Sequence, residues 1–284
     1  MTEKIKIRIG HSPDSDDAFM FYALAEKKIV TDKYEFTHEL LDIETLNHRA
    51  FNGDFELTAM SVHAYAYLSD KYLFCQSGAS MGENYGPVLI ENGNWDYRNL
   101  TAPARVAIPG ELTSAFLALK LYFAEIGREN IEYVVVPFDK IIESVKSGET
   151  DAGLLIHEGQ LTYIRDGFRL IVDLGVWWML GVGLPLPLGA NGIRRDLPPD
   201  VIVDVTKLLN ESIQYALNFR EDALDHALKF GRGLERYDVD QFVGMYVNNL
   251  TLDLGENGKQ SVREFLKRAY DTGAVPKLVE PEFV

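Results

Sequence analysis

One order of predicted elements occurs twice along this chain, and this repetition constrains the fold more than any other feature of the sequence. In the first half, an alternating strand pattern at 4–10 leads through a Pro-containing loop into a helical pattern at 17–28. In the second half, a strand pattern at 105–108 leads through Pro-Gly into a helical pattern at 113–126. Both predicted helices carry Ala-Phe in the first turn, next to residue types that cap helices.

The repetition continues with a strand, a helix that ends at Gly, and another strand. We expect these elements at 34–41, 43–51 and 55–60 in the first half and at 131–136, 138–146 and 151–156 in the second. Gly is a common helix terminator, and strand–helix–strand units build parallel sheets with right-handed crossovers. The chain is therefore predicted to be an α/β protein with two lobes.

The repetition also locates a ligand site. Ligands of open α/β sheets bind beyond the carboxyl ends of the strands, where the helices begin. This rule selects the loops at 11–17, 58–63, 109–115 and 156–160. If the two lobes face each other, the four loops meet at one cleft.

The rest of the chain has a different character. The segment 173–188 is rich in Gly, Pro and Trp, and we interpret it as a connection that crosses between the lobes. Helical periodicity follows, and then a tail that we expect to be an extended strap; the ranges are 200–218, 220–230, 238–250 and 257–271 for the helices and 276–284 for the tail. We expect these helices to pack on the first lobe, so that 1–90 and 185–284 form the larger lobe and 91–184 the smaller one.

The balance of charge restricts the possible partners. A formal net charge of −15 argues against binding nucleic acid or an anionic membrane surface. An anionic small molecule would instead be held by helix N-termini and hydroxyl groups. The sequence shows no signal-peptide pattern and no apolar run near the ~18–20 residues of a membrane span, so we expect a cytoplasmic protein. Cys75 is the only cysteine, and we interpret it as a buried packing residue rather than a nucleophile.

The residue best placed for chemistry is His157, which follows the nearly apolar strand 152–156 and precedes Glu158. An imidazole at a strand end in a cleft suits general base catalysis because its pKa lies near neutrality. The alternative is a structural histidine whose ring nitrogens bond to nearby backbone. The residues alone leave both interpretations open.

The loop at 12–17 contains three carboxylates in four residues, which at first suggests a metal site. The EF-hand pattern requires a longer loop with Gly and a late Glu, and both are absent from it. We favour Ser15 and Asp16 as helix caps, with Asp17 in the first turn, and we predict ligand contacts from Ser12 and Asp16 and no metal.

Two further places in the predicted cleft carry hydroxyl groups. Thr113 and Ser114 begin the second helix, where hydroxyls and backbone N–H groups form either an anion pocket or an ordinary N-cap. Ser61 ends its strand at a position that mirrors His157. The pair Trp177-Trp178 fits either a surface that stacks on a ring-containing ligand or internal packing.

Motifs for several other chemistries are absent from the sequence. It contains no Gly-rich phosphate loop, no paired histidines with zinc-ligand spacing and no GxSxG nucleophile motif. We therefore expect neither a cofactor nor a serine hydrolase.

Several segments together carry a family resemblance. They are FYAL at 21–24, ETLN at 44–47, GLLIHE at 153–158, VDLGVWW at 172–178 and GLPLPLG at 183–189. On these segments, and over nearly the whole length, the chain resembles the 1,4-dihydroxy-6-naphthoate synthases of the futalosine route to menaquinone. The resemblance implies a two-lobed periplasmic-binding-protein-like (type II) fold with an interlobe cleft and C-terminal helices. The chain departs from the family at 12–17, where it reads SPDSDD and the family often reads SPCPND.

The resemblance also implies an activity and a site. It implies a lyase that converts cyclic dehypoxanthinyl futalosine, a small anionic aromatic substrate, to 1,4-dihydroxy-6-naphthoate without a cofactor. His157, in the family's Ile-His-Glu, would be the general base. Together with the cleft loops, it implies substrate contacts at Ala59, Met60, Ser61, Thr113, Ser114 and Ala115. The sequence does not indicate an oligomeric state.

Three other functions remain possible at this point. A chorismate dehydratase of the same pathway shares the fold, although the IHE and WW…GLPLPLG segments favour the naphthoate synthase. A non-catalytic solute-binding protein would use the same cleft, but it would carry a secretion signal or lipid anchor. A cytoplasmic sensor would need neither.

Overall fold

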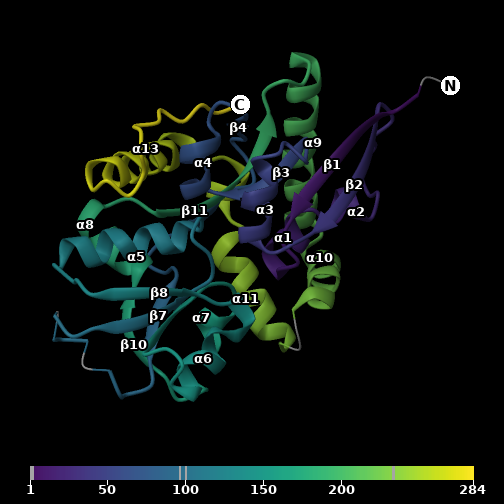
Figure 1. The fold of residues 1–284 in the computed structure, drawn as a ribbon. Helices are drawn as coiled ribbons and strands as arrows, with labels where there is room; N and C mark the ends of the chain where they lie inside the picture. Colours follow the sequence, from purple (N-terminus) through teal and green to yellow (C-terminus); the bar gives the residue numbers. More distant parts are fainter. Residues whose placement is uncertain (1–2, 96, 100, 232–233) are drawn as a thin grey trace.

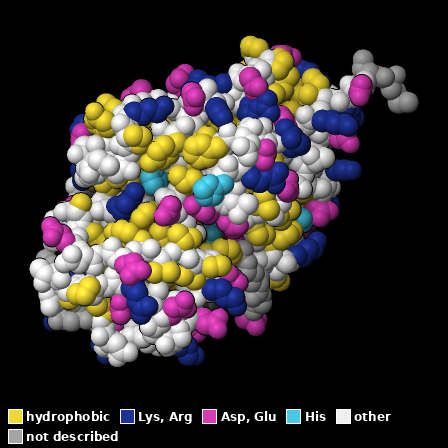
Figure 2. All heavy atoms as spheres, viewed as in Figure 1, with side chains coloured by type: hydrophobic (Ala, Val, Ile, Leu, Met, Phe, Trp, Pro, Cys, Tyr) yellow, Lys and Arg dark blue, Asp and Glu magenta, His cyan; other side chains and the backbone are white. Residues whose placement is uncertain are grey.

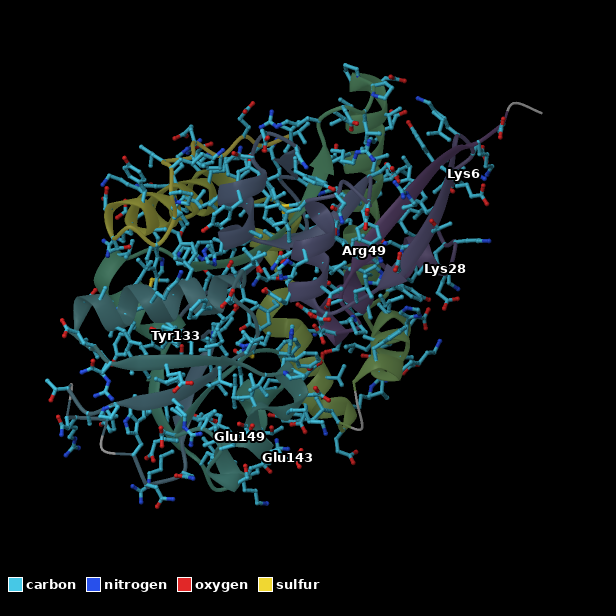
Figure 3. The ribbon with its side chains drawn as sticks, in the orientation of Figure 1. Lys6, Lys28, Arg49, Tyr133, Glu143 and Glu149 are labelled. Carbon is cyan, nitrogen blue, oxygen red and sulfur yellow. The ribbon has the colours of Figure 1, made fainter. Side chains whose placement is uncertain are left out.

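Two sheets, each covered by helices, form the two lobes of the protein (Figure 1). The computed structural model describes residues 3–95, 97–99, 101–231 and 234–284. In Figure 3, Lys6 and Arg49 mark the first lobe, and Tyr133 and Glu143 mark the second.

The first lobe is built on a six-stranded sheet of order β2-β1-β3-β11-β4, with β5 paired to β11. β1 runs parallel to both β2 and β3, whereas β11 runs antiparallel to β3, β4 and β5. The strands are β1 (Ile5–His11), β2 (Tyr34–Leu40), β3 (Leu57–Ser61), β4 (Tyr72–Phe74), β5 (Ser80–Gly82) and β11 (Leu186–Arg194).

The second lobe is built on a five-stranded sheet of order β10-β6-β9-β7-β8. β7 runs parallel to β8 and β9, and β6 runs antiparallel to β9 and β10. The strands are β6 (Val88–Glu91), β7 (Ala104–Ile108), β8 (Ile131–Val135), β9 (Ala152–Leu155) and β10 (Arg169–Asp173). The parallel triplets β2-β1-β3 and β8-β7-β9 have the same order, as the repetition in the sequence requires.

The strands of the repeat pair in parallel, as predicted, and each triplet is extended by an antiparallel strand, β11 in the first sheet and β6 in the second. These strands enter where the chain passes from one lobe to the other and back, so they approach the triplets from the opposite end. β6 spans the expected lobe boundary at residue 90, and its partners lie in the second sheet. The expected lobe boundaries at residues 90 and 185 stay a prediction.

The helices between the strands cover the sheets and begin at the cleft. In the first lobe they are α1 (Ser15–Met20), α2 (Tyr22–Ala25), α3 (Ile43–Ala50) and α4 (Val62–Leu68). In the second lobe they are α5 (Ser114–Glu125), α6 (Ile141–Ser147), which a 3₁₀ turn precedes at Phe138–Lys140, and α7 (Gly159–Thr162).

The segment 173–188 crosses between the lobes, as expected, and most of this connection is helical. Most of it forms α8 (Leu174–Val182), which leads from β10 of the second sheet to β11 of the first. The Asp173 side chain caps this helix by accepting from the N–H groups of Gly175 and Val176, at 2.9 and 3.1 Å. Gly183, with φ of 74°, ends it in the left-handed conformation that glycine adopts most easily.

The C-terminal helices follow the predicted ranges closely. They are α9 (Pro199–Asn218), α10 (Arg220–Ala227) with a 3₁₀ turn at Leu228–Phe230, α11 (Arg236–Tyr246), α12 (Asn249–Leu252) and α13 (Gly255–Asp271). Buried positions recur every three or four residues along α9, as expected for a helix that packs one face on the first lobe.

α13 differs from the expectation, because it contacts both lobes. It packs on β11 and α4 of the first lobe and on α5 of the second (Figure 1). Its Phe265 lies edge-on to the fully buried Trp178 of α8, with 5.3 Å between the ring centroids. Trp178 is therefore a packing residue. The indole N–H of Trp177 donates instead to the Glu125 side chain on the surface of α5, at 3.2 Å.

The tail lies in an extended course beside β4. The Phe74 N–H donates to Glu282 O at 3.0 Å, and the Val284 N–H donates to Phe74 O at 2.9 Å. Cys75, next to this strand, is fully buried, and burial raises the pKa of its thiol. Among the described residues, no helix is long and apolar enough to span a bilayer.

Candidate active site

A cavity of about 110 Å³ lies between the lobes, where the strand ends and helix starts of the repeat meet. All nine residues that the sequence predicts as site residues line it: Ser12, Asp16, Ala59, Met60, Ser61, Thr113, Ser114, Ala115 and His157. The predicted convergence of the cleft loops is therefore present in the fold. The individual roles of these residues stay predictions.

His157 follows β9 in a left-handed conformation, with φ of 56°, which is uncommon for a residue that is not glycine. Its Nδ1 lies 2.9 Å from Oδ2 of Asp14, and only 16% of the side chain is exposed. Because a carboxylate only accepts hydrogen bonds, Nδ1 carries a proton. Among the described residues, none bonds to the other ring nitrogen, Nε2, although it is buried.

The surroundings of His157 shift its pKa in opposite directions. Burial lowers the pKa, but the charge of Asp14 and the hydrogen bond to it raise the pKa further, to about 9. An ordinary imidazole has a pKa near 6.5, so this ring is a stronger base than a free one. The neighbouring Phe138 ring packs edge-on against it, with 4.9 Å between the centroids.

The loop that precedes α1 brings its carboxylates to the same end of the cavity. The expectation that Ser15 and Asp16 cap α1 is wrong, because Asp14 occupies the N-cap position and its side chain turns to His157. The Asp17 side chain instead accepts from the N–H of Ser12 at 2.7 Å. This arrangement uses the carboxylates to order the loop.

Two of these carboxylates hold their protons more tightly than usual. Burial, and next the nearby Asp17, raise the pKa of Asp16 well above its ordinary value. Burial raises the pKa of Asp17 to about 6, against the hydrogen bond from Ser12. A protonated Asp16 can donate a hydrogen bond into the cavity, which a carboxylate cannot do.

The opposite side of the cavity is the N-terminus of α5. Thr113 is its N-cap: the side chain accepts from the Phe116 N–H at 3.2 Å and donates to Gly110 O at 2.9 Å. Ser114 opens the helix, and its Oγ accepts from the His63 N–H at 3.3 Å. The free N–H groups of a helix start attract anions. Capping and anion binding are therefore compatible here.

The protonated imidazole of His157 is the one cationic side chain in the described lining of the cavity. Among the described residues, no Lys or Arg lines it. On the face drawn in Figure 2, basic and acidic side chains are interspersed rather than gathered into one field. A bound carboxylate would therefore depend on the α5 start and on nearby hydroxyls.

Ser61 at the end of β3 is held by a residue that sequence reasoning missed. The Asn47 amide of α3 accepts from the Ser61 N–H at 2.9 Å and donates to Ser61 Oγ at 3.0 Å, and Asn47 is fully buried. The same helix reaches the second lobe, where the Glu44 carboxylate accepts from the Leu112 N–H at 3.1 Å. In the sequence, Glu44 and Asn47 are marked only by belonging to the ETLN segment at 44–47, one of the segments that carry the family resemblance.

Replacing Asn47 with Ala is expected to lower the free energy of unfolding by about 1–3 kcal/mol, because the Ser61 N–H and hydroxyl lose their buried partner. Urea unfolding of the purified variant measures this change. Asn52→Ala, which alters an exposed residue after the same helix, is the matched control. Equal stability of the two variants would contradict the assigned role.

Aromatic residues of α11 close the cavity and were also missed. Phe242 and Tyr246 line it, and the Tyr246 hydroxyl lies 2.8 Å from the Gln160 side chain of α7. In the sequence these residues fit the apolar face of a helix, which predicts core packing and carries no sign of a site.

The lobes are in contact on the cleft side. The Ser15 hydroxyl donates to Oε1 of Glu158 at 2.9 Å, next to the contact of Asp14 with His157. Farther out, Arg165 after α7 pairs with Asp238 of α11 at 2.6 Å. These contacts join the two lobes across the cleft.

Comparisons with known proteins place the chain among named relatives. Residues 7–271 match the model of a family described as menaquinone biosynthesis. The 1,4-dihydroxy-6-naphthoate synthase of Thermus thermophilus is 37% identical over 98% of this chain and 99% of its own length. A crystal structure of an Archaeoglobus fulgidus protein is 43% identical, with a TM-score of 0.89, over 95% of this chain and 98% of that one.

The fold is also shared with more distant proteins. The periplasmic aliphatic sulphonate binding protein of Escherichia coli has a TM-score of 0.65 at 15% identity, covering 98% of this chain and 91% of that one. At this identity the likeness concerns the fold alone. It confirms the two-lobed periplasmic-binding-protein-like architecture.

Proposed function

Because this chain belongs to the menaquinone biosynthesis family, we propose that it is a 1,4-dihydroxy-6-naphthoate synthase whose active site is the cleft between its lobes. The observation that carries the proposal has two parts. The chain is 37% identical to the Thermus enzyme over nearly its full length, and a buried imidazole, that of His157, lies at the cleft. The substrate would be cyclic dehypoxanthinyl futalosine. As a biosynthetic enzyme, the protein would act in the cytoplasm.

The chemistry assigned to the cleft is proton removal followed by fragmentation. Nε2 of His157 would remove a proton from the sugar-derived ring of the substrate, and formation of the naphthalene system would drive the cleavage. The cleavage would release a three-carbon sugar fragment as the second product. The raised pKa of His157 leaves the ring mostly protonated near neutral pH, so the base acts through its neutral fraction, which is a stronger base than a free imidazole.

The substrate carboxylate would lie at the N-terminus of α5. Ser114, Ala115 and Ser61 line this side of the cavity, and no Lys or Arg lines the cavity among the described residues. The carbohydrate-derived part would then lie toward Ser12 and Asp16, whose polar groups suit hydroxyls. Contact between the lobes would exclude water and align the base with its proton.

A turnover assay tests the activity. Purified protein is incubated with cyclic dehypoxanthinyl futalosine and, separately, with chorismate, and the products are identified by liquid chromatography with mass spectrometry. Formation of 1,4-dihydroxy-6-naphthoate from the first substrate is the expected result. Dehydration of chorismate would identify the sister enzyme of the pathway, and binding without turnover would identify a receptor; either outcome contradicts the proposal.

A further inference from the structure

The imidazole of His157 is held by a side chain from the other lobe. Asp14 belongs to the loop between β1 and α1, its side chain is 2% exposed, and its Oδ2 lies 2.9 Å from Nδ1 of His157. Nε2, on the far side of the ring, bonds to none of the described residues. The bond to Asp14 therefore decides which ring nitrogen carries the proton and which one is available as a base.

We propose that Asp14 is a positioning residue for catalysis, and that closure of the lobes assembles the base by bringing its carboxylate onto Nδ1 of His157. This inference rests on the proposed function, since it assigns the base of that reaction a partner. Asp14 itself need not touch the substrate. Its work is to keep the proton on Nδ1 and to aim Nε2 into the cavity.

The conformation of His157 supports a need for such a partner. Its backbone is in the left-handed region, with φ of 56°, and conformations of this kind persist when the surroundings determine them. The ring packs edge-on against Phe138, which limits its tilt but supplies no hydrogen bond. The carboxylate of Asp14 fixes the remaining rotation about the bond to the ring.

Four acidic groups face His157. They are Asp14 in the loop, Asp16 and Asp17 in the first turn of α1, and Glu158, the next residue in the chain. Burial raises the pKa of Asp16 well above its ordinary value and that of Asp17 to about 6, and Glu158 accepts a hydrogen bond from Ser15. Asp14 contacts a ring nitrogen directly, with 2.9 Å between its Oδ2 and Nδ1 of His157.

The two partners come from different lobes, so the pair depends on closure. Asp14 follows β1 of the first sheet, and His157 follows β9 of the second. The adjacent contact of Ser15 with Glu158 crosses the same gap without touching the imidazole. The contact of Ser15 with Glu158 contributes to closure and leaves the ring nitrogen unaffected. Removing it therefore distinguishes a role in closure from a role in positioning the imidazole.

The test compares Asp14→Asn, Asp14→Glu and Ser15→Ala by kcat, KM and the dependence of kcat/KM on pH. At a pH high enough for His157 to be neutral in both proteins, we expect Asp14→Asn to lower kcat at least about tenfold with little change in KM, and by no more than loss of His157 itself does. The amide can donate to Nδ1 and so place the proton on Nε2. Asp14→Glu should recover part of the activity.

The pH profile distinguishes positioning from closure. Without the charge of Asp14, burial lowers the pKa of His157, so the inflection of kcat/KM should move to lower pH in Asp14→Asn. Ser15→Ala should raise KM and keep the wild-type inflection. If both variants change KM alone, Asp14 is a closing contact and the inference is wrong.

A measurement without turnover separates this inference from the proposed function. The His157 ring is titrated by NMR in the wild type and in Asp14→Asn, with urea unfolding as the check that both are folded. We expect the wild-type ring to titrate well above the variant ring. Equal titration of the two overturns the pairing, whether or not the protein turns over cyclic dehypoxanthinyl futalosine.

Discussion

Replacing His157 with Asn is expected to lower kcat for 1,4-dihydroxy-6-naphthoate formation by roughly 10²–10⁴-fold, the contribution typical of a general base. Asn is chosen because it tolerates the left-handed backbone at φ of 56° better than Ala does, so that loss of activity is not confused with loss of fold. Single-turnover kinetics and urea unfolding are measured on both proteins. A variant with wild-type kcat would remove His157 from the mechanism.

The wild-type enzyme should become more active as the pH rises through about 9. The neutral form of His157 is the base, and its raised pKa keeps the ring protonated below that value. The ion pair with Asp14 shows the opposite trend: its contribution to closure is full below the ordinary pKa of histidine and is lost as the pH rises through about 9. A profile that instead falls from neutral pH upward would contradict the role of a base.

The largest expected change in stability is at Gly175, where substitution by Ala should lower the free energy of unfolding by about 1–3 kcal/mol or more. A Cβ at this position would lie 1.9 Å from the carbonyl oxygen of Tyr85 and 2.2 Å from its carbonyl carbon. Both atoms are backbone, so neither can move aside as a flexible side chain does. The collision falls where the chain first passes between the lobes.

Gly181→Ala is the matched control for this prediction. It lies in the same helix, α8, and a Cβ there would meet nothing within 4 Å. Removing a helical glycine should therefore raise stability by up to about 1 kcal/mol. The two variants are compared by urea unfolding and by the turnover assay. Similar stability in both would show that the backbone at Tyr85 yields, against the expectation.

The parts of the fold that sequence reasoning found are those with a local signal. The strands of the repeat are apolar runs bounded by turns, and α9 shows its buried face directly in its spacing. β4, β5, β6 and β10 were not predicted, because they are short and are defined by pairing with distant strands. A short stretch of sequence does not indicate which distant strand it pairs with.

The crossing of 173–188 between the lobes was predicted, but its helix was not, and the reason is physical. Gly175 and Gly181 lower the helical propensity of the segment, and tertiary contacts outweigh that loss. The Asp173 cap satisfies the first N–H groups of α8, and burial of Trp178 against Phe265 stabilises the helix. A preference of a few tenths of a kcal/mol per residue decides little where a large aromatic side chain is buried.

The candidate site was predictable in position and less so in its connections. The carboxyl-end rule selected the loops that carry Ser61, Ser114 and His157, and all three line one cavity. The contact between Asp14 and His157 was missed because the two residues are 143 positions apart in the sequence and belong to different lobes. No sequence pattern marks such a contact.

The position of α13 restricts how the protein can admit and release a molecule. Its contacts with β11 and α4 on one lobe, and with α5 on the other, lie on the side where the buried core is continuous. Opposite this side are the polar contacts of Ser15 with Glu158 and of Arg165 with Asp238. We therefore expect the polar contacts to part first when the lobes open, while α13 stays packed on both lobes.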